Sequence, residues 1–250
     1  EVEHSAVQKI YDLARFTKDP FFLTVSFTHP HSPFVTTQKY WDLYDHKKIE
    51  MPAVPPIALQ DLDEMSRWLH YAHAADKHTI TQEHIRTARH AYYGMISYID
   101  DKFGSLIDAL TETGLLEDTI VLFTSDHGEM LGERGMWYKQ CFFEWSARVP
   151  LIVRYPREFK ASRVNNLVSL VDLLPTIMDC ASGEEFKGFV SPIDGRSLIN
   201  LLSGSSLKDE NFVVSEYTGE GVIAPCRMVR WNNYKYIYTH GYEPLLYDLK

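Results

Sequence analysis

The stretch that decides the fold is Thr124-Ser125-Asp126-His127-Gly128-Glu129, which directly follows the apolar run from Asp118 to Phe123. A continuous apolar run bounded by turn-forming residues is typical of a buried parallel strand. Open α/β sheets bind their ligands beyond the carboxyl ends of such strands. The sequence therefore places a carboxylate, Asp126, and an imidazole, His127, side by side at the expected position of a site.

These two side chains suit a divalent metal ion. The Asp126 carboxylate is a hard oxygen donor that favours calcium, magnesium or manganese, whereas the His127 imidazole shifts the preference towards transition metals. Calcium is our first choice, with manganese or magnesium as the alternative. Lys139, thirteen residues after Asp126, can reach back as a point charge for an anion. Without a ligand, the same residues describe only an Asp-capped turn after a strand.

The remaining sequence predicts an α/β core followed by a small all-β part. Apolar spacing predicts helices at residues 5–17, 59–74, 82–113, 171–180 and 196–203, and strands at 21–27, 119–125 and 149–154. After Gly204, short alternating runs predict strands at 212–216, 227–231, 234–238 and 245–247, with Asn232-Asn233 as a hairpin turn. We therefore expect residues 1–204 to belong to the core and residues 205–250 to begin an antiparallel subdomain.

The amino-acid composition limits the kinds of molecule that this protein can bind. The 250 residues carry a formal net charge of −9, which argues against nucleic acid, because a phosphate backbone calls for a basic surface. No apolar run approaches the roughly 20 residues of a membrane span. The three cysteines, Cys141, Cys180 and Cys226, are odd in number and widely spaced, which favours packing roles and a reducing compartment over a disulfide framework.

Several ordered motifs carry a family resemblance. They are Thr28-His29-Pro30-His31-Ser32-Pro33, the helix from Arg86 to Leu110, Ser125-Asp126-His127-Gly128, Ser146-Ala147-Arg148-Val149-Pro150, Leu170-Val171-Asp172-Leu173-Leu174-Pro175-Thr176 and Asp194-Gly195-Arg196-Ser197-Leu198. In this order the chain resembles the sulfatase branch of the alkaline phosphatase superfamily. Within that branch, residues 132–139 and the stretch from Ser215 to Cys226 look most like choline sulfatases.

The resemblance implies a fold and a set of site residues. The fold would be an alkaline-phosphatase-like mixed sheet sandwiched by helices. Asp126 and His127 would bind the metal, and Lys139 would bind a sulfate oxygen. His31, the His of His-x-Pro, would contact the sulfate or protonate the leaving oxygen, as a general acid does. Glu216 would face the cationic end of choline, since a quaternary ammonium is held by carboxylates and aromatic faces.

The resemblance also shows what these residues lack. The family nucleophile lies in Cys/Ser-x-Pro-x-Arg and becomes formylglycine, yet no such motif occurs in the 250 residues. The family's N-terminal metal-binding aspartate pair is missing too. We therefore expect the chain to be the C-terminal portion of a sulfatase, truncated at both ends and inactive alone. The resemblance implies a parent that is a cytoplasmic homo-oligomer and hydrolyses a small sulfate ester, choline sulfate, to choline and sulfate.

Two other functions stay open at this point. A phosphonate monoester or phosphodiester hydrolase of the same superfamily shares the Asp-His pair, and a non-catalytic sulfatase-like module would only bind an anion. The histidines at 70, 73, 78, 84 and 90 lack a consistent ligand spacing, so we expect most of them to be solvated. Arg148 is expected to be structural.

Overall fold

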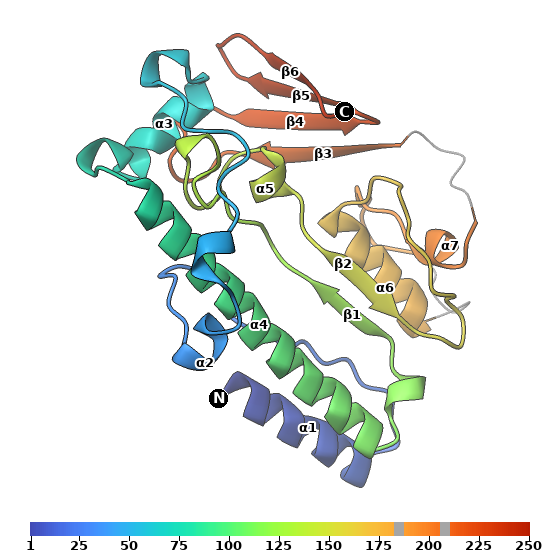
Figure 1. Cartoon of the computed structure of the whole chain (residues 1–250). Helices are drawn as coiled ribbons and strands as arrows, with labels where there is room; N and C mark the ends of the chain where they lie inside the picture. Colours follow the sequence, from blue (N-terminus) through green and yellow to red (C-terminus); the bar gives the residue numbers. More distant parts are fainter. Residues whose placement is uncertain (183–187, 206–210) are drawn as a thin grey trace. The chain divides into compact units, whose positions relative to one another are not determined.

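The computed structural model describes residues 1–182, 188–205 and 211–250 (Figure 1). The chain divides into two compact units that are described separately below. The first unit comprises Glu1–Ile57, Asp76–Ile120 and Met130–Tyr138. The second comprises Ala58–Ala75, Val121–Glu129 and Lys139–Lys250.

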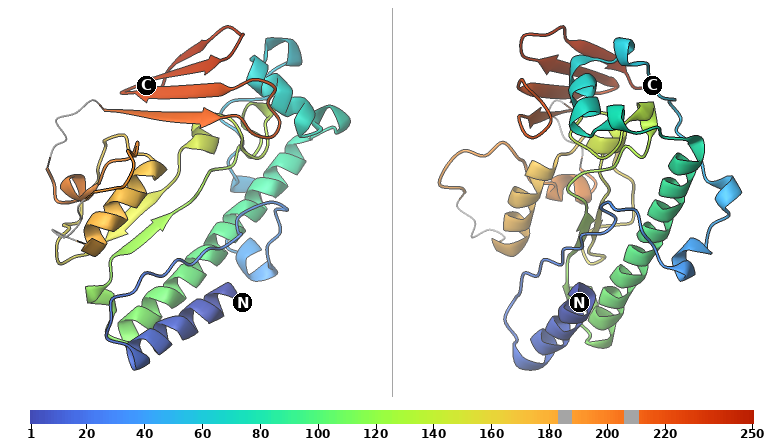
Figure 2. Two further views of the ribbon diagram at one scale, coloured as in Figure 1. Left: turned by 180° about the vertical axis from the view of Figure 1, so that it is seen from behind. Right: turned by 90° about the vertical axis from the view of Figure 1, so that its left-hand side faces the viewer.

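The first unit is built on one long helix. Helix α4, Gln82–Glu112, has 31 residues and confirms the helix predicted at 82–113. Helix α1, Val2–Phe16, packs alongside it, as both views of Figure 2 show. The two helices are held together by the apolar face of α1 and by an ion pair between Lys102 Nζ and Glu3 Oε2, which are 2.7 Å apart. The short helix α2, Gln38–Trp41, also lies on α4.

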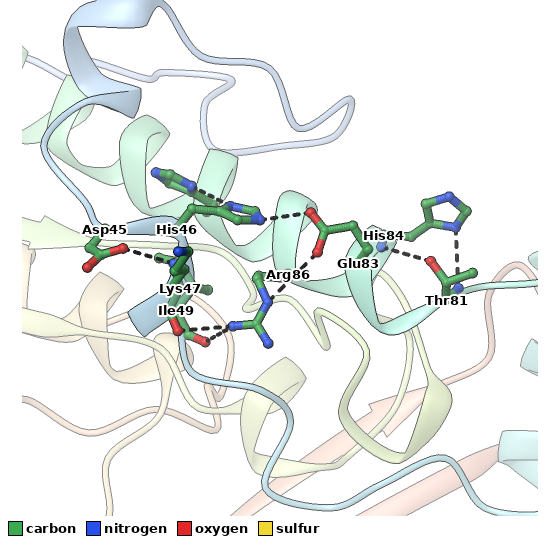
Figure 3. Close-up of polar contacts among 9 residues, drawn as sticks. Asp45, His46, Lys47, Ile49, Thr81, Glu83, His84 and Arg86 are labelled. Carbon is green, nitrogen blue, oxygen red and sulfur yellow. Dashed lines mark hydrogen bonds and ion pairs between the residues drawn. The ribbon is translucent and has the colours of Figure 1, made fainter.

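Polar contacts of His84 secure the start of α4 (Figure 3). The Thr81 hydroxyl accepts from the His84 amide at 3.2 Å, and His84 Nδ1 accepts from the Thr81 amide at 3.3 Å, which completes a capping box. His90 is buried and stacks on Trp41, with ring centroids 3.6 Å apart. His84 is exposed, as expected for most of these histidines, and also caps the helix, whereas His90 belongs to the core.

Two predicted elements differ in the structure. Residues 21–27 are not in a strand, although their apolar spacing predicts one. The helix predicted at 59–74 is interrupted: a 3₁₀ turn, η2, spans Leu59–Asp61, and helix α3 spans Glu64–Ala72. The interruption follows from Asp63, whose carboxylate accepts from the Ser66 amide at 3.0 Å and so begins a new helix. The other 3₁₀ turns are η1 (His46–Lys48), η3 (Ala75–Lys77), η4 (Leu116–Asp118), η5 (Glu133–Gly135) and η6 (Leu170–Asp172).

In the second unit, the strand that precedes Asp126 is shorter and differently paired than predicted. Strand β1, Val121–Thr124, pairs with β2, Leu151–Arg154, and the two run antiparallel, with Val121 opposite Arg154. The residues of β1 are half-buried, so it is not the fully buried parallel strand that the apolar run suggests. Asp126 and His127 nevertheless follow its carboxyl end, as expected.

The C-terminal strands form the predicted antiparallel sheet, in the order β3-β4-β5-β6. Their bounds are Phe212–Tyr217, Cys226–Trp231, Tyr234–Thr239 and Leu245–Asp248. Trp231 lies opposite Tyr234, which confirms the Asn232-Asn233 turn. One face of the sheet buries Cys226, Met228 and Ile237. Because side chains alternate between faces, the other face carries the exposed residues of the same strands. This sheet belongs to the second unit, together with residues on both sides of the boundary predicted at 204.

Two of the motifs that carry the family resemblance dock on each other in the second unit. Helix α6, Leu173–Ser182, follows η6, and helix α7, Ile199–Leu202, follows the second motif. The buried Asp172 carboxylate accepts from the Ser169 amide at 2.8 Å and from the Arg196 amide at 2.9 Å. In this unit the two motifs therefore hold each other's backbone in place through the Asp172 carboxylate.

Candidate active site

The Asp126-His127 loop arranges its own hydrogen bonds so that two donor atoms remain available. Asp126 Oδ1 accepts from the His127 amide at 3.0 Å, and Ser125 Oγ donates to the His127 carbonyl at 2.6 Å. His127 Nδ1 lies 2.9 Å from the Gly128 carbonyl. A carbonyl only accepts, so Nδ1 carries the proton in this contact, and Nε2 of the neutral ring has a free lone pair.

The donor pair fits part of a metal site. His127 Nε2 and Asp126 Oδ2 lie 3.6 Å apart, so both can face one ion. The contact of Nδ1 with a carbonyl is the arrangement that usually orients a metal-binding histidine. Two protein donors are fewer than a structural or catalytic site uses. Within residues 1–182, 188–205 and 211–250, no group of three or more His, Cys, Asp or Glu could hold an ion. The pair therefore fits as a portion of a larger ligand set.

The loop is supported from behind by a short helix, α5, which spans Glu144–Ala147. The Gly128 amide donates to the Ser146 carbonyl at 2.8 Å, and the Glu129 amide donates to the Trp145 carbonyl at 2.9 Å. A Cβ at position 128 would lie 2.0 Å from the Trp145 carbonyl oxygen. Only glycine allows this approach, so the close contact with α5 explains the glycine after His127.

A cavity of about 1310 Å³ in the second unit is lined by Asp126, His127 and Lys139. The structure therefore brings three of the predicted site residues to one cavity. Four cationic side chains line it, Lys139, Arg148, Arg230 and Lys235, against the two carboxylates of Asp126 and Glu144. The excess of positive charge suits an anionic ligand. Arg148, expected to be structural, is exposed on the cavity wall.

Lys139 is held in an unusual backbone. Tyr138 before it has φ 63° and Gln140 after it has φ 74°, in the left-handed region that costs a non-glycine residue about 1–2 kcal/mol. The Gln140 side chain is held by His73, whose Nε2 lies 2.6 Å from Oε1. Such strain persists where the surroundings over-determine it and is frequent at functional sites. The role of Lys139 in binding an anion stays a prediction.

His31 belongs to the first unit, whereas the cavity belongs to the second. It is exposed, and its Nδ1 lies 2.7 Å from the Ser32 carbonyl oxygen. The peptide bonds before Pro30 and Pro33 are both cis. As in His127, the carbonyl oxygen can only accept, so Nδ1 carries the proton in this contact. His31 stays a predicted catalytic residue.

Glu216 lies on the face of β3 opposite Tyr217, which lines the cavity. Its Oε1 is 2.7 Å from Arg227 Nε in an ion pair that is about 60% exposed on both sides. Glu216 is not among the cavity-lining residues. The structure therefore does not bring it together with Asp126, His127 and Lys139, and its contact with substrate stays a prediction.

The cysteines are poor nucleophile candidates. Burial raises the pKa of Cys141 to about 11, and burial also raises the pKa of Cys180 and of Cys226. A thiol with a raised pKa is protonated at neutral pH and reacts slowly. All three are free, and Cys141 and Cys226 are buried, in agreement with the packing roles predicted from the sequence.

Sequence reasoning missed a charged cluster on the cavity wall. Glu144 Oε1 is 2.5 Å from Lys235 Nζ, and its Oε2 is 2.7 Å from Arg230 Nη1. Burial acts to raise the pKa of Glu144, but the Lys235 hydrogen bond and the charges of Lys235 and Arg230 outweigh it and lower the pKa. The signal was present in the sequence: Lys235 stands at an inward position of an alternating strand, where a lysine needs a buried partner.

Comparison with known proteins agrees with the resemblance. Residues 3–183 match the family model described as "Sulfatase", and residues 132–250 match the one described as "N-sulphoglucosamine sulphohydrolase, C-terminal". The chain is 41% identical to a choline-sulfatase of Rhizobium meliloti over 256 residues, covering 100% of the chain and 49% of that protein. It is 32% identical to arylsulfatase K of Xenopus laevis, covering 98% and 49%.

A solved structure extends the comparison to three dimensions. The phosphonate monoester hydrolase of Silicibacter pomeroyi matches with a TM-score of 0.79 and 26% identity, covering 99% of this chain and 53% of that one. The chain thus spans about half the length of the curated relatives it matches. No helix in the described residues is long and apolar enough to cross a membrane.

Proposed function

Because the chain belongs to the sulfatase family, we propose that the complete protein hydrolyses a sulfate ester, with choline sulfate as the substrate. The observation that carries this proposal is the Asp126-His127 pair, with Oδ2 and Nε2 free and 3.6 Å apart beside a cationic cavity. The substrate is suggested by the 41% identity to a choline-sulfatase.

The residues of this chain would divide the work as follows. Asp126 and His127 would hold a divalent ion, calcium first and manganese or magnesium next, which would supply Lewis acidity at a sulfate oxygen. The family resemblance implies a formylglycine outside these 250 residues as the nucleophile. Lys139 would bind a sulfate oxygen and neutralise the charge that develops on the ester. His31 would give a proton to the leaving oxygen as the ester bond breaks.

A second candidate is hydrolysis of a phosphonate monoester. It is favoured by the match to a phosphonate monoester hydrolase structure and by the cation excess of the cavity, which suits any tetrahedral anion. A third candidate, a non-catalytic sulfatase-like module, would bind the anion without turnover.

The test is release of sulfate from choline sulfate by the complete protein, with an aryl phosphonate as the comparison substrate. We expect preferential turnover of choline sulfate, and a loss of about 10²–10³ in kcat for Lys139→Met, the scale seen when one charge-stabilising donor is removed. Asp126→Asn should lower the affinity for added calcium or manganese. Preferential turnover of the phosphonate would favour the second candidate, and binding of sulfate without turnover of either substrate would favour the third.

A further inference from the structure

The loop that carries Asp126 and His127 depends on helix α5, but α5 has only four residues. A helix this short has almost no intrinsic stability and must be held by its surroundings. Its carbonyls nevertheless accept the amides of Gly128 and Glu129. The position of the loop is therefore decided by whatever fixes α5.

The first residue of α5, Glu144, is fixed by two cations of the C-terminal sheet. Lys235 Nζ donates both to Glu144 Oε1 and to the Phe142 carbonyl, each at 2.5 Å. Arg230 Nη1 donates to Glu144 Oε2 at 2.7 Å. Both carboxylate oxygens are thus engaged, and the lysine also holds the chain two residues before the helix.

The cluster has an electrostatic logic. Arg230 and Lys235 are direct cross-strand partners in β4 and β5, and like charges in that relation repel. The Lys235 side chain is only 3% exposed, so its charge needs a partner. The Glu144 carboxylate lies between the two cations and compensates both. The sheet therefore holds α5 by charge as well as by hydrogen bonds.

We propose that Glu144 is a positioning residue that ties the Asp126-His127 loop to the C-terminal sheet through α5. The tie reaches the donor atoms in few steps: Glu144 fixes α5, the Ser146 carbonyl fixes the Gly128 amide, and the Gly128 carbonyl orients the His127 ring. That the loop binds a metal rests on the proposed function; that Glu144 holds the loop does not.

The test compares Glu144→Gln with Glu64→Gln. Glu64 is a matched control in the same unit, because it pairs with Arg67 at 2.7 Å and its side chain has the same 32% exposure as that of Glu144. For Glu144→Gln we expect hydrogen exchange at the Gly128 and Glu129 amides to accelerate at least about tenfold. In the complete protein, the affinity for calcium or manganese, measured by calorimetry, should fall about 10- to 100-fold, as for other residues that orient ligands. Glu64→Gln should change neither quantity.

A double variant separates positioning from simple stability. Glu144→Gln with Lys235→Met removes the uncompensated lysine, so the melting temperature should recover towards that of the unmodified protein. The tie is still cut, so exchange at Gly128 and Glu129 should stay fast. Recovery of slow exchange in the double variant, or unchanged exchange in Glu144→Gln, would overturn the proposal. Absence of metal binding in the unmodified protein would instead count against the proposed function and leave the exchange result valid.

Discussion

Two stretches that follow each other in the sequence, residues 126–129 and Met130–Tyr138, use acidic side chains in opposite ways. The Asp126 side chain is 85% exposed and keeps Oδ2 free of backbone partners. The Glu133 side chain is 1% exposed, and its two oxygens accept from the amides of Ala53 and Val54, each at 3.0 Å. A carboxylate with a free oxygen can take a ligand, whereas one saturated by backbone amides holds a loop.

The backbone differs between the two stretches as well. Within Met130–Tyr138, Leu131, Gly132, Arg134, Gly135 and Tyr138 all have φ between 45° and 85°. This stretch forms backbone hydrogen bonds of its own, such as that of the Gly132 amide to the Met136 carbonyl at 2.8 Å. The Glu133 carboxylate then joins the stretch to the amides of Ala53 and Val54. Residues 126–129 instead borrow carbonyls from α5. Residues 130–138 are therefore held by a side chain, the Glu133 carboxylate, which we call the side-chain lock. Residues 126–129 are held by backbone hydrogen bonds to α5, which we call the backbone lock.

The largest loss of stability is expected when the side-chain lock is removed by Glu133→Ala. The change leaves two backbone amides without acceptors and removes the carboxylate that lies 3.5 Å from buried Arg89 Nη1. We expect the free energy of unfolding to fall by about 3–5 kcal/mol, measured by urea denaturation. Glu64→Ala, which breaks a partly exposed pair, should cost less than about 1 kcal/mol. A similar small loss for both variants would contradict the distinction.

The backbone lock is tested by Gly128→Ala. The new methyl would lie 2.0 Å from the Trp145 carbonyl oxygen, so the loop must move away from α5. We expect a loss of about 1–3 kcal/mol and faster exchange at the Gly128 and Glu129 positions. Gly104→Ala is the matched control: it lies in α4 with no atom within 4 Å of the added carbon, and it should stabilise by up to about 1 kcal/mol. Equal behaviour of the two variants would exclude a close-approach role for Gly128.

The sequence predicts the helices, the strands and the Asp126-His127 pair better than it predicts the partners of the buried carboxylates. Helix α4 and the C-terminal strands follow from apolar periodicity, because each period is local to its own segment. The Asp126-His127 pair follows from its place after a strand. The partners of Glu133 and Glu144 do not, because they lie 44 to 91 residues away along the chain. A single sequence shows that a buried charge needs a partner, but not which one.

Pairing explains the remaining differences. Residues 21–27 have the apolar spacing of a strand, yet a strand is defined by its neighbour, and these residues are not in a strand. The exposed position of Glu216 has a similar origin. Its alternation with Tyr217 is visible in the sequence, but the face that meets the cavity is set by the register of β3 with β4.

Acid should weaken the Glu144 tie in a defined pH window. The pKa of Glu144 is lowered in the folded protein, since burial is outweighed by the Lys235 hydrogen bond and the nearby cations. A lowered folded pKa means that the contribution is complete above the unfolded value of roughly 4.5 and is lost as pH falls through the folded value. We expect a gap of about 1–3 kcal/mol in unfolding free energy between the unmodified protein and Glu144→Gln at pH 7. The gap should narrow below pH of about 4.5; a gap that grows towards acid would contradict this assignment.

The smallest effect is expected for Glu216→Gln, which sharpens the comparison because Glu216 is exposed like Asp126 but faces away from the cavity. Its ion pair with Arg227 is about 60% exposed, and such pairs contribute 0–1 kcal/mol. We therefore expect the unfolding free energy to change by less than about 0.5 kcal/mol, while KM for choline sulfate tests the predicted contact with substrate. A KM that rises for choline sulfate but not for an aryl sulfate without a cationic group would support Glu216 as a ligand of the cationic end, and an unchanged KM for both would contradict that role.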